Sequence, residues 1–425
     1  MLGIGFADHK QRALVDWSSV RALAIQSDDW GLRGFVPDAE SLTDFDTERL
    51  GGTRFPPVYW RSTLEDSVDV AQLASMLLSH EGRDNLPAVF QPNMILSGQS
   101  VASPPARASD PAAWEPDPRY QRRGLGQAVA DAMAAGVWHP EFHGLHHYDP
   151  QGRVLALAEA DDEVHRALER GILAFPGSHS AFELGPRRSL DDVRESWAGI
   201  DRRFAEVYGY SMTSVIAGDY VWESRHEVLF RELGLRAVQA KSHQHRRDFQ
   251  GPALWKRVRM AFDRSWDRLT VRDLVYLNRT ALLETAQSDD PVAHRQRCLE
   301  DIRASWRRGE PAVVETHRVN YVLTDTIAAR EGRNHLNRLL GDIDVFEPLY
   351  VSDAELVGLA TRGFSAVRRG PVWILRNPGS ATRVAILPGN GHSGQPLWRR
   401  VLIPAHATLI LDDETNAMLH RDRLD

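Results

Sequence analysis

The stretch RALAIQSDDWG, residues 21–31, begins with mostly apolar side chains and ends in two adjacent carboxylates and a Trp-Gly pair. A short apolar run that leads into polar residues and glycine is typical of a buried strand followed by a loop. Because neighbouring side chains on an extended strand point in opposite directions, we expect Asp28 and Asp29 to have different tasks. The alternative is a pair of loop aspartates that only caps a helix or a turn.

Strand-like and helix-like patterns alternate over most of the chain. Helices are predicted over residues 63–79, 124–135, 161–170, 190–208, 225–233 and 293–308, and further strands over 86–96, 212–217, 236–239 and 312–315. A succession of strand, helix and strand implies parallel pairing. We therefore predict an α/β fold, a distorted parallel (β/α) barrel over residues 1–352, with its functional groups at the carboxyl ends of the strands.

The pattern changes after Asp353. Short apolar strands separated by Gly, Pro and Asn are predicted over residues 364–368, 372–376, 383–387, 398–403 and 407–411. We interpret residues 353–425 as a small all-β module that supports the barrel rather than supplying catalytic groups.

Length and composition agree with a large domain and an appended one. The chain has 425 residues, which exceeds one ordinary core, and its 51 basic and 58 acidic residues are interspersed at a net charge of -7. This balance argues against nucleic acid or an anionic membrane as a partner. A single cysteine, Cys298, excludes an intrachain disulfide and a cysteine-rich metal site. The absence of a long apolar segment predicts a cytoplasmic protein without membrane insertion.

The stretch HPEFHGLHH, residues 139–147, is the densest histidine cluster in the chain. Histidines four residues apart on a helical turn can bind one ion, and neutral imidazole suits Zn²⁺. Since Pro140 is not tolerated inside a helix, the pair His143 and His147 is favoured over a pair that includes His139. Together with Asp29 they would supply three protein ligands and leave one position open, as in catalytic zinc sites. A histidine cluster can also be an ordinary solvated loop.

The remaining candidates have acid–base chemistry. His317 follows the predicted strand 312–315 and titrates near neutrality, so it could protonate a leaving group. Asp28 lies beside a predicted metal ligand and could accept a proton from the attacking water. A lone histidine at a strand end is otherwise often structural.

At these residues the sequence resembles the polysaccharide deacetylase family, also called chitooligosaccharide-deacetylase-like proteins. IQSDDWG at residues 25–31, HGLHH at 143–147 and VVETH at 313–317 correspond to three of its motifs. The middle of the chain is similar to a branch associated with bacterial surface-polysaccharide biosynthesis. The resemblance implies a distorted barrel and a divalent metal, usually zinc.

The resemblance also implies roles for individual residues. Asp28 would be the catalytic base and His317 the general acid, while Asp29, His143 and His147 would bind the metal. The stretch VIAGDYVW, residues 215–222, occupies the place of the third motif but lacks the arginine that usually contacts the catalytic aspartate. Arg279 is a candidate to replace it.

The function implied is hydrolysis of an acetyl group on a sugar or polysaccharide by metal-activated water. The candidate substrate-binding residues are Trp30, Tyr220, Trp222 and Arg279, with Tyr148 as a further aromatic side chain. The same aromatic rings could simply be packed in the core. The alternatives are an amidase or glycosidase on the same barrel, and a carbohydrate-binding protein without activity.

Overall fold

The computed structural model describes residues 14–31, 36–47, 50, 56–97, 118–172, 183–185, 188–241, 270–271, 274–390, 396–413 and 418–424. The strands of the main sheet are β1 (Ala22–Trp30), β2 (Phe90–Met94), β3 (Glu141–Phe142), β4 (Ser214–Val215), β5 (Ala237–Ala240), β6 (Thr270–Val271), β7 (Val275–Asn278), β8 (Ala281–Leu282), β9 (Ala312–His317) and β10 (Leu349–Tyr350).

These strands follow the order β6-β7-β5-β4-β3-β2-β1-β9-β8, and β10 pairs with the start of β1. All pairs are parallel except β6 with β7. Only two residues separate β7 from β8, yet β7 bonds to β5 and β8 bonds to β9. This segment therefore joins the two sides of the strand path, and the sheet curls into a distorted barrel. The predicted fold class is confirmed.

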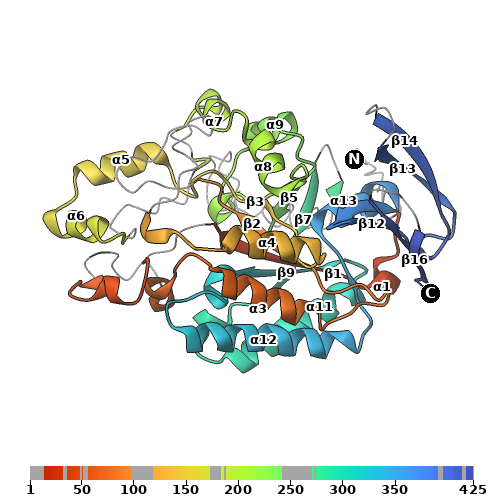
Figure 1. The fold of residues 1–425 in the computed structure, drawn as a ribbon, viewed down its shortest axis with the longest axis horizontal. Coiled ribbons are helices and arrows are strands. Elements are labelled where there is room, and N and C mark those ends of the chain that lie inside the picture. Colours follow the sequence, from red (N-terminus) through yellow and green to blue (C-terminus); the bar gives the residue numbers. More distant parts are fainter. Residues whose placement is uncertain are drawn as a thin grey trace, which may run out of the picture.

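Helices surround the barrel (Figure 1). They are α1 (Trp17–Val20), α3 (Ser67–Leu77), α4 (Leu125–Ala134), α5 (Pro150–Ala158), α6 (Asp162–Glu169), α7 (Leu190–Ser196), α8 (Ile200–Tyr208), α9 (Ser224–Glu232), α11 (Pro291–Arg307), α12 (Thr326–Asp344) and α13 (Asp353–Arg362). Short 3-10 helices are η1 (Glu40–Leu42), η3 (Pro57–Arg61), η5 (Pro118–Tyr120), η6 (Gly218–Tyr220), η7 (Thr285–Gln287) and η8 (Arg318–Asn320). None of the helices in the described ranges is long and apolar enough to cross a membrane.

The apolar faces of the helices form two large core clusters around the sheet. Side chains of α3, α11 and α12, such as Leu73, Ile302 and Leu340, pack with β1, β2 and β9 in the first cluster. Side chains of α7, α8 and α9 pack with β3, β4 and β5 in the second. The predicted helix over 190–208 is in fact two helices, because Gly199 between them takes a left-handed conformation (φ +80°) that breaks the helical hydrogen bonding.

The described residues of the C-terminal segment form six antiparallel strands, of which β11 to β15 match the five predicted strands. β11 (Ser365–Arg369), β12 (Val372–Asn377), β15 (Ala407–Asp412) and β16 (Met418–Arg423) form one sheet, and β13 (Arg383–Asn390) and β14 (Pro396–Ile403) form another. They lie at one end of the barrel, in dark blue in Figure 1.

The segment is not all-β, however, because it begins with α13. A capping box between Ser352 and Glu355 starts this helix, and Leu356 and Leu359 pack against the base of the barrel. The expected domain boundary at residues 352 and 353 thus falls at the first turn of a helix that contacts the barrel, and a separate domain beyond it stays a prediction.

Candidate metal and catalytic site

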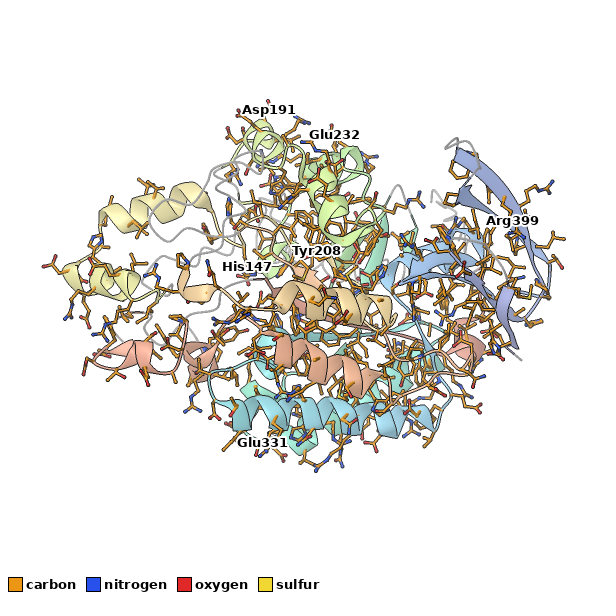
Figure 2. All side chains as sticks on the ribbon, viewed as in Figure 1. His147, Asp191, Tyr208, Glu232, Glu331 and Arg399 are labelled. Carbon is orange, nitrogen blue, oxygen red and sulfur yellow. The ribbon has the colours of Figure 1, made fainter. Side chains whose placement is uncertain are left out.

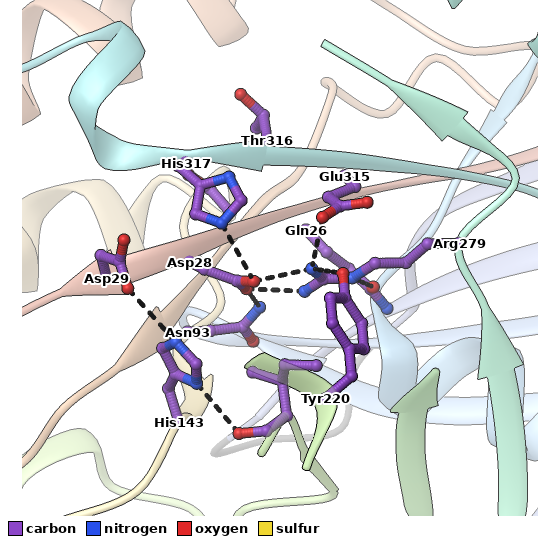
Figure 3. Close-up of polar contacts among 12 residues, drawn as sticks. Gln26, Asp28, Asp29, Asn93, His143, Tyr220, Arg279, Glu315, Thr316 and His317 are labelled. Atoms are coloured by element: carbon purple, nitrogen blue, oxygen red, sulfur yellow. Dashed lines mark hydrogen bonds and ion pairs between the residues drawn. The ribbon is translucent and has the colours of Figure 1, made fainter. Parts of the chain in front are cut away.

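The candidate residues gather at the carboxyl ends of the barrel strands, which we call the mouth. Asp28 and Asp29 come from β1, His143 directly follows β3, Arg279 follows β7, and His317 ends β9 (Figure 3). Parallel strands bring these ends together although the residues are far apart in the sequence. Figure 2 shows His147 near the middle of the molecule, well away from Arg399 on β14.

The two aspartates do not follow the strand alternation expected for them. Asp29 has a left-handed backbone (φ +70°), and the register of β1 against β2 shifts between Ser27 and Trp30. This irregularity turns the chain so that both carboxylates reach residues at the mouth. Figure 3 shows Asp28 directed at Arg279 and Asp29 directed at His143.

Asp29, His143 and His147 form a three-residue group suited to a metal ion. Asp29 Oδ1 lies 3.3 Å from Nε2 of each histidine and, though buried, makes no hydrogen bond with any residue that the structure describes. His143 donates from Nδ1 to the Ile216 carbonyl oxygen at 2.9 Å, which leaves Nε2 as its ligand atom. Two ligands bound tetrahedrally at about 2.0–2.1 Å from one ion are about 3.3–3.4 Å apart. The spacing and the donor types therefore fit a zinc-like cation.

The histidines are positioned by a loop, and the expected helical turn is wrong. Residues 143–147 are non-helical, with positive φ at Gly144 (+106°) and His147 (+62°). The Glu183 carboxylate accepts the backbone N–H groups of this loop, those of Leu145, His146 and His147, at 3.1–3.3 Å. Because the carboxylate satisfies donors that a helix would bond internally, the loop can curve back and bring His147 to Asp29.

Two neighbouring histidines, His139 and His146, lie outside the group. His139 stacks on Tyr210, and burial lowers the pKa of His139 to about 4. The Nδ1 atom of His146 lies 2.9 Å from the Ser97 hydroxyl. Among the residues that the structure describes, only Asp29, His143 and His147 come together in this way.

Arg279 forms a bidentate ion pair with Asp28. Its two terminal nitrogens donate to Asp28 Oδ2 at 2.7 Å and Oδ1 at 2.6 Å, and Asn93 donates to Oδ1 at 2.7 Å. Burial alone would raise the pKa of Asp28, but the Arg279 guanidinium outweighs it and holds this pKa well below its ordinary value. Arg279 thus supplies the contact that the third motif lacks. Its side chain is fully buried, so the expected role in binding substrate directly is not supported.

His317 pairs with a carboxylate that sequence reasoning missed. Its Nδ1 donates to Glu284 Oε1 at 2.6 Å, and its Nε2 lies 3.8 Å from Asp28 Oδ2. Burial would lower the pKa of His317, but the Glu284 carboxylate outweighs it and raises this pKa to about 10. Asn320 holds Glu284 by donating to its other oxygen at 2.9 Å. Glu284 lies two residues after β8, so its position past a strand was a usable signal.

Most of the aromatic candidates are core residues. Trp30 is 0% exposed and packs edge-on against Phe90 and Trp138. Trp222 is 1% exposed and donates from its indole to Glu227, and Tyr148 is also buried. Their rings are therefore closed to a ligand in this structure, which corrects the assignment of Trp30 and Trp222 as substrate-binding residues.

Tyr220 is the aromatic candidate that remains at the mouth. It is half-buried, and its hydroxyl accepts from Arg279 at 2.6 Å. The Lys241 ammonium lies 4.4 Å from the centre of its ring and 2.5 Å from Glu315 Oε1. Lys241 and Glu315 were not predicted from the sequence, although Lys241 directly follows β5 and Glu315 lies two residues before the end of β9.

No family model and no curated protein matches the chain. Among solved structures, a proposed polysaccharide deacetylase from Mycobacterium smegmatis is 15% identical, with 80% of this chain and 89% of that chain covered and a TM-score of 0.37. A modular endo-β-1,4-mannanase from Cellulomonas fimi is 12% identical, with 97% of each chain covered and a TM-score of 0.29. At such identities and TM-scores, neither protein assigns this chain to a family.

Proposed function

We propose that the chain is a metal-dependent hydrolase that removes an acetyl group from a sugar or polysaccharide. The observation that carries the proposal is the convergence of Asp29 Oδ1 with Nε2 of His143 and of His147, at 3.3 Å each. A divalent cation held there, with Zn²⁺ expected from the ligand types, would polarise the acetyl carbonyl and make water a stronger nucleophile.

Asp28 is the proposed general base. Arg279 keeps its carboxylate ionised, and Asp28 adjoins the ligand Asp29, so it lies beside the place where water attacks. The bonds from Arg279 and Asn93 also fix its orientation. An ionised, oriented carboxylate can accept the proton that the water loses.

His317 is the proposed general acid. With Nδ1 bonded to Glu284, Nε2 is the atom that can donate a proton to the leaving sugar oxygen or nitrogen. The raised pKa of His317 keeps that proton in place at neutral pH. Hydrolysis requires one group that is ionised and accepts a proton and another that is protonated and donates one. The lowered pKa of Asp28 and the raised pKa of His317 give this pair of states.

The acetylated sugar substrate is supported by motifs that resemble those of polysaccharide deacetylases and by Tyr220 at the mouth, where its half-buried ring could contact a sugar. An amidase or a glycosidase would use the same groups on another bond. The cytoplasmic location, and the absence of nucleic-acid and membrane partners, stay predictions.

Metal analysis and acetate release test the proposal. His143→Ala and His147→Ala should each lose the metal and the release of acetate from acetylated oligosaccharides. His146→Ala, in the same loop but outside the group, is the control and should keep the metal. Full metal occupancy in both ligand variants, with the fold intact, would contradict the metal site. A metal-loaded wild type that cleaves other amides or glycosidic bonds, but releases no acetate, would contradict the reaction.

A further inference from the structure

A chain of buried polar residues links the base of the barrel to Asp28. Gln26, Asn93, Ser214 and Gln239 lie on barrel strands, whereas Asp353 is the first residue of α13 in the C-terminal segment, and all five are 0% exposed. Buried polar groups need hydrogen-bond partners, and an amide side chain has one donor end and one acceptor end. If a neighbour fixes the nitrogen end of an amide side chain, the oxygen end must face the opposite partner as an acceptor.

One branch runs from Asp353 through Gln26 to Arg279. Gln26 donates from Nε2 to Asp353 Oδ1 at 2.7 Å. Its Oε1 consequently faces Arg279 and accepts from Nε at 2.9 Å. If Gln26 were reversed, its N–H groups would point at a guanidinium that can only donate.

The second branch starts at the other oxygen of Asp353. Ser214 donates its hydroxyl proton to Asp353 Oδ2 at 2.6 Å, so it can accept from Gln239 Nε2, at 3.0 Å. Gln239 then presents Oε1 to Arg279, which donates to it at 2.7 Å.

The second branch also reaches Asp28 directly. Gln239 Nε2 donates to Asn93 Oδ1 at 2.7 Å, which turns the amide nitrogen of Asn93 toward Asp28 Oδ1. Both branches thus end on the pair formed by Arg279 and Asp28.

We infer that Asp353 is a positioning residue for the catalytic pair. Because its two oxygens accept from Gln26 at 2.7 Å and from Ser214 at 2.6 Å, it orients the amides of Gln26, Gln239 and Asn93 so that their oxygen and nitrogen ends match Arg279 and Asp28. The inference rests on the proposed function for its catalytic consequence, but the orientation of Arg279 is a structural property that can be measured by itself. It also gives the C-terminal segment a part in the active site.

Kinetics of Asp353→Asn test this role. Asparagine keeps the shape of aspartate but places N–H donors toward either Gln26 or Ser214, so one branch must reverse or lose its bond. We expect kcat to fall roughly 10- to 100-fold, the usual effect of a residue that supports a catalytic group, with KM and metal content unchanged. In an Arg279→Lys background the same substitution should cost less, because two of the three contacts that the chain makes with the pair are to Arg279 and one is to Asp28. An equal loss in both backgrounds, or no loss in either, would overturn the inference.

A second measurement does not need a substrate. The Arg279 Nε–H group should give a slowly exchanging signal in ¹⁵N-arginine NMR spectra, assigned by its loss in Arg279→Lys. In Asp353→Asn and in Asp353→Ala, where water can replace the carboxylate, the signal should shift and exchange faster. An unchanged signal in both variants would refute the positioning role. A shifted signal in a protein that releases no acetate would refute only the proposed function.

Glu355→Gln is the matched control. Glu355 is a second buried acid on α13, and it bonds to Arg369 and Arg376 rather than to the chain that leads to Asp28. Its substitution should lower the thermal midpoint but leave the Arg279 signal and kcat per bound metal unchanged. Equal effects of the two substitutions on kcat would mean that Asp353 only stabilises the fold.

Discussion

Asp28 Oδ2 and His317 Nε2 lie 3.8 Å apart. A neighbour of opposite charge favours the ionised form of each side chain. Arg279 lowers the pKa of the carboxyl below what burial would impose, and Glu284 raises the pKa of the imidazole above what burial would impose. The two neighbours follow different strands of the barrel. Each proposed catalytic role therefore depends on a pair of residues.

Substitution of the two proposed catalytic residues should affect turnover but not metal binding. Asp28→Asn and His317→Ala should each reduce kcat roughly 10²- to 10⁴-fold, the usual contribution of general acid–base catalysis. The combined variant should lose less than the product of the two factors, because both residues act on one intermediate. Kinetics and metal content are measured on the same samples. Loss of metal in His317→Ala would instead make His317 a ligand.

The pH dependence of kcat/KM in the Glu284→Gln variant tests the pair formed by His317 and Glu284. The pKa of His317 is raised to about 10, so its protonated form persists at neutral pH and is lost as the pH rises through that value. Without the Glu284 carboxylate this pKa falls, and the alkaline decline of kcat/KM should move to lower pH. An alkaline limb at the same pH in wild type and variant would contradict the assignment.

At the scale of elements, the loop at residues 143–147 depends on Glu183. A Cβ atom added at Gly144 would lie 2.4 Å from Glu183 Oε2, and φ there is +106°. The carboxylate that holds the loop thus leaves no room for a larger residue. The position of the His147 side chain therefore depends on the close contact between Gly144 and the Glu183 carboxylate.

Gly144→Ala should therefore weaken metal binding. We expect a loss of affinity of roughly 10- to 100-fold, as for other residues that orient metal ligands, measured by metal titration of the apoprotein. Gly234→Ala is the control, since Gly234 also has positive φ (+80°) but none of the described residues lies within 4 Å of the added Cβ. It should cost about 1–2 kcal/mol of stability and leave metal affinity unchanged. Equal metal affinity in both variants would contradict the role of the Glu183 contact.

At the scale of the whole molecule, a buried cluster of charges connects the C-terminal sheet to the barrel. Arg376 on β12 donates to Asp84 at 2.8 Å and to Glu355 on α13 at 2.5 Å, and Arg369 on β11 also bonds to Glu355. Burial would raise the pKa of Glu355, but the two arginines lower it to about 2. These carboxylates depend on the arginines to remain buried as anions.

Arg376→Ala should therefore destabilise the protein by about 3–5 kcal/mol, the usual cost of leaving a buried charge unpaired. Arg368→Ala, on β11, is the control because Arg368 is 44% exposed and pairs with Asp413 near the surface. Its loss should cost about 0–1 kcal/mol. Urea unfolding measures both values. Similar unfolding midpoints for the two variants would show that the cluster does not hold the sheet to the barrel.

Several features could be predicted from the sequence because they depend on local patterns. The apolar run before Asp28 predicted β1, and the alternation that follows predicted parallel pairing. The position of Asp29 after a predicted strand and the four-residue spacing of His143 and His147 identified these three residues as neighbours, which the structure brings together. Strand periodicity and turn residues likewise predicted β11 to β15, whereas β16 was not predicted.

Other features were decided only by the tertiary structure, because they depend on residues distant in sequence. The left-handed turn at Asp29 and the curved histidine loop need partners on other elements, and no local pattern encodes the Glu183 contact. Trp30 lies in the core rather than at the mouth because Phe90 and Trp138 enclose it. The partners of Asp28 and His317 were set by barrel closure, which brings strands from separate parts of the chain to one mouth.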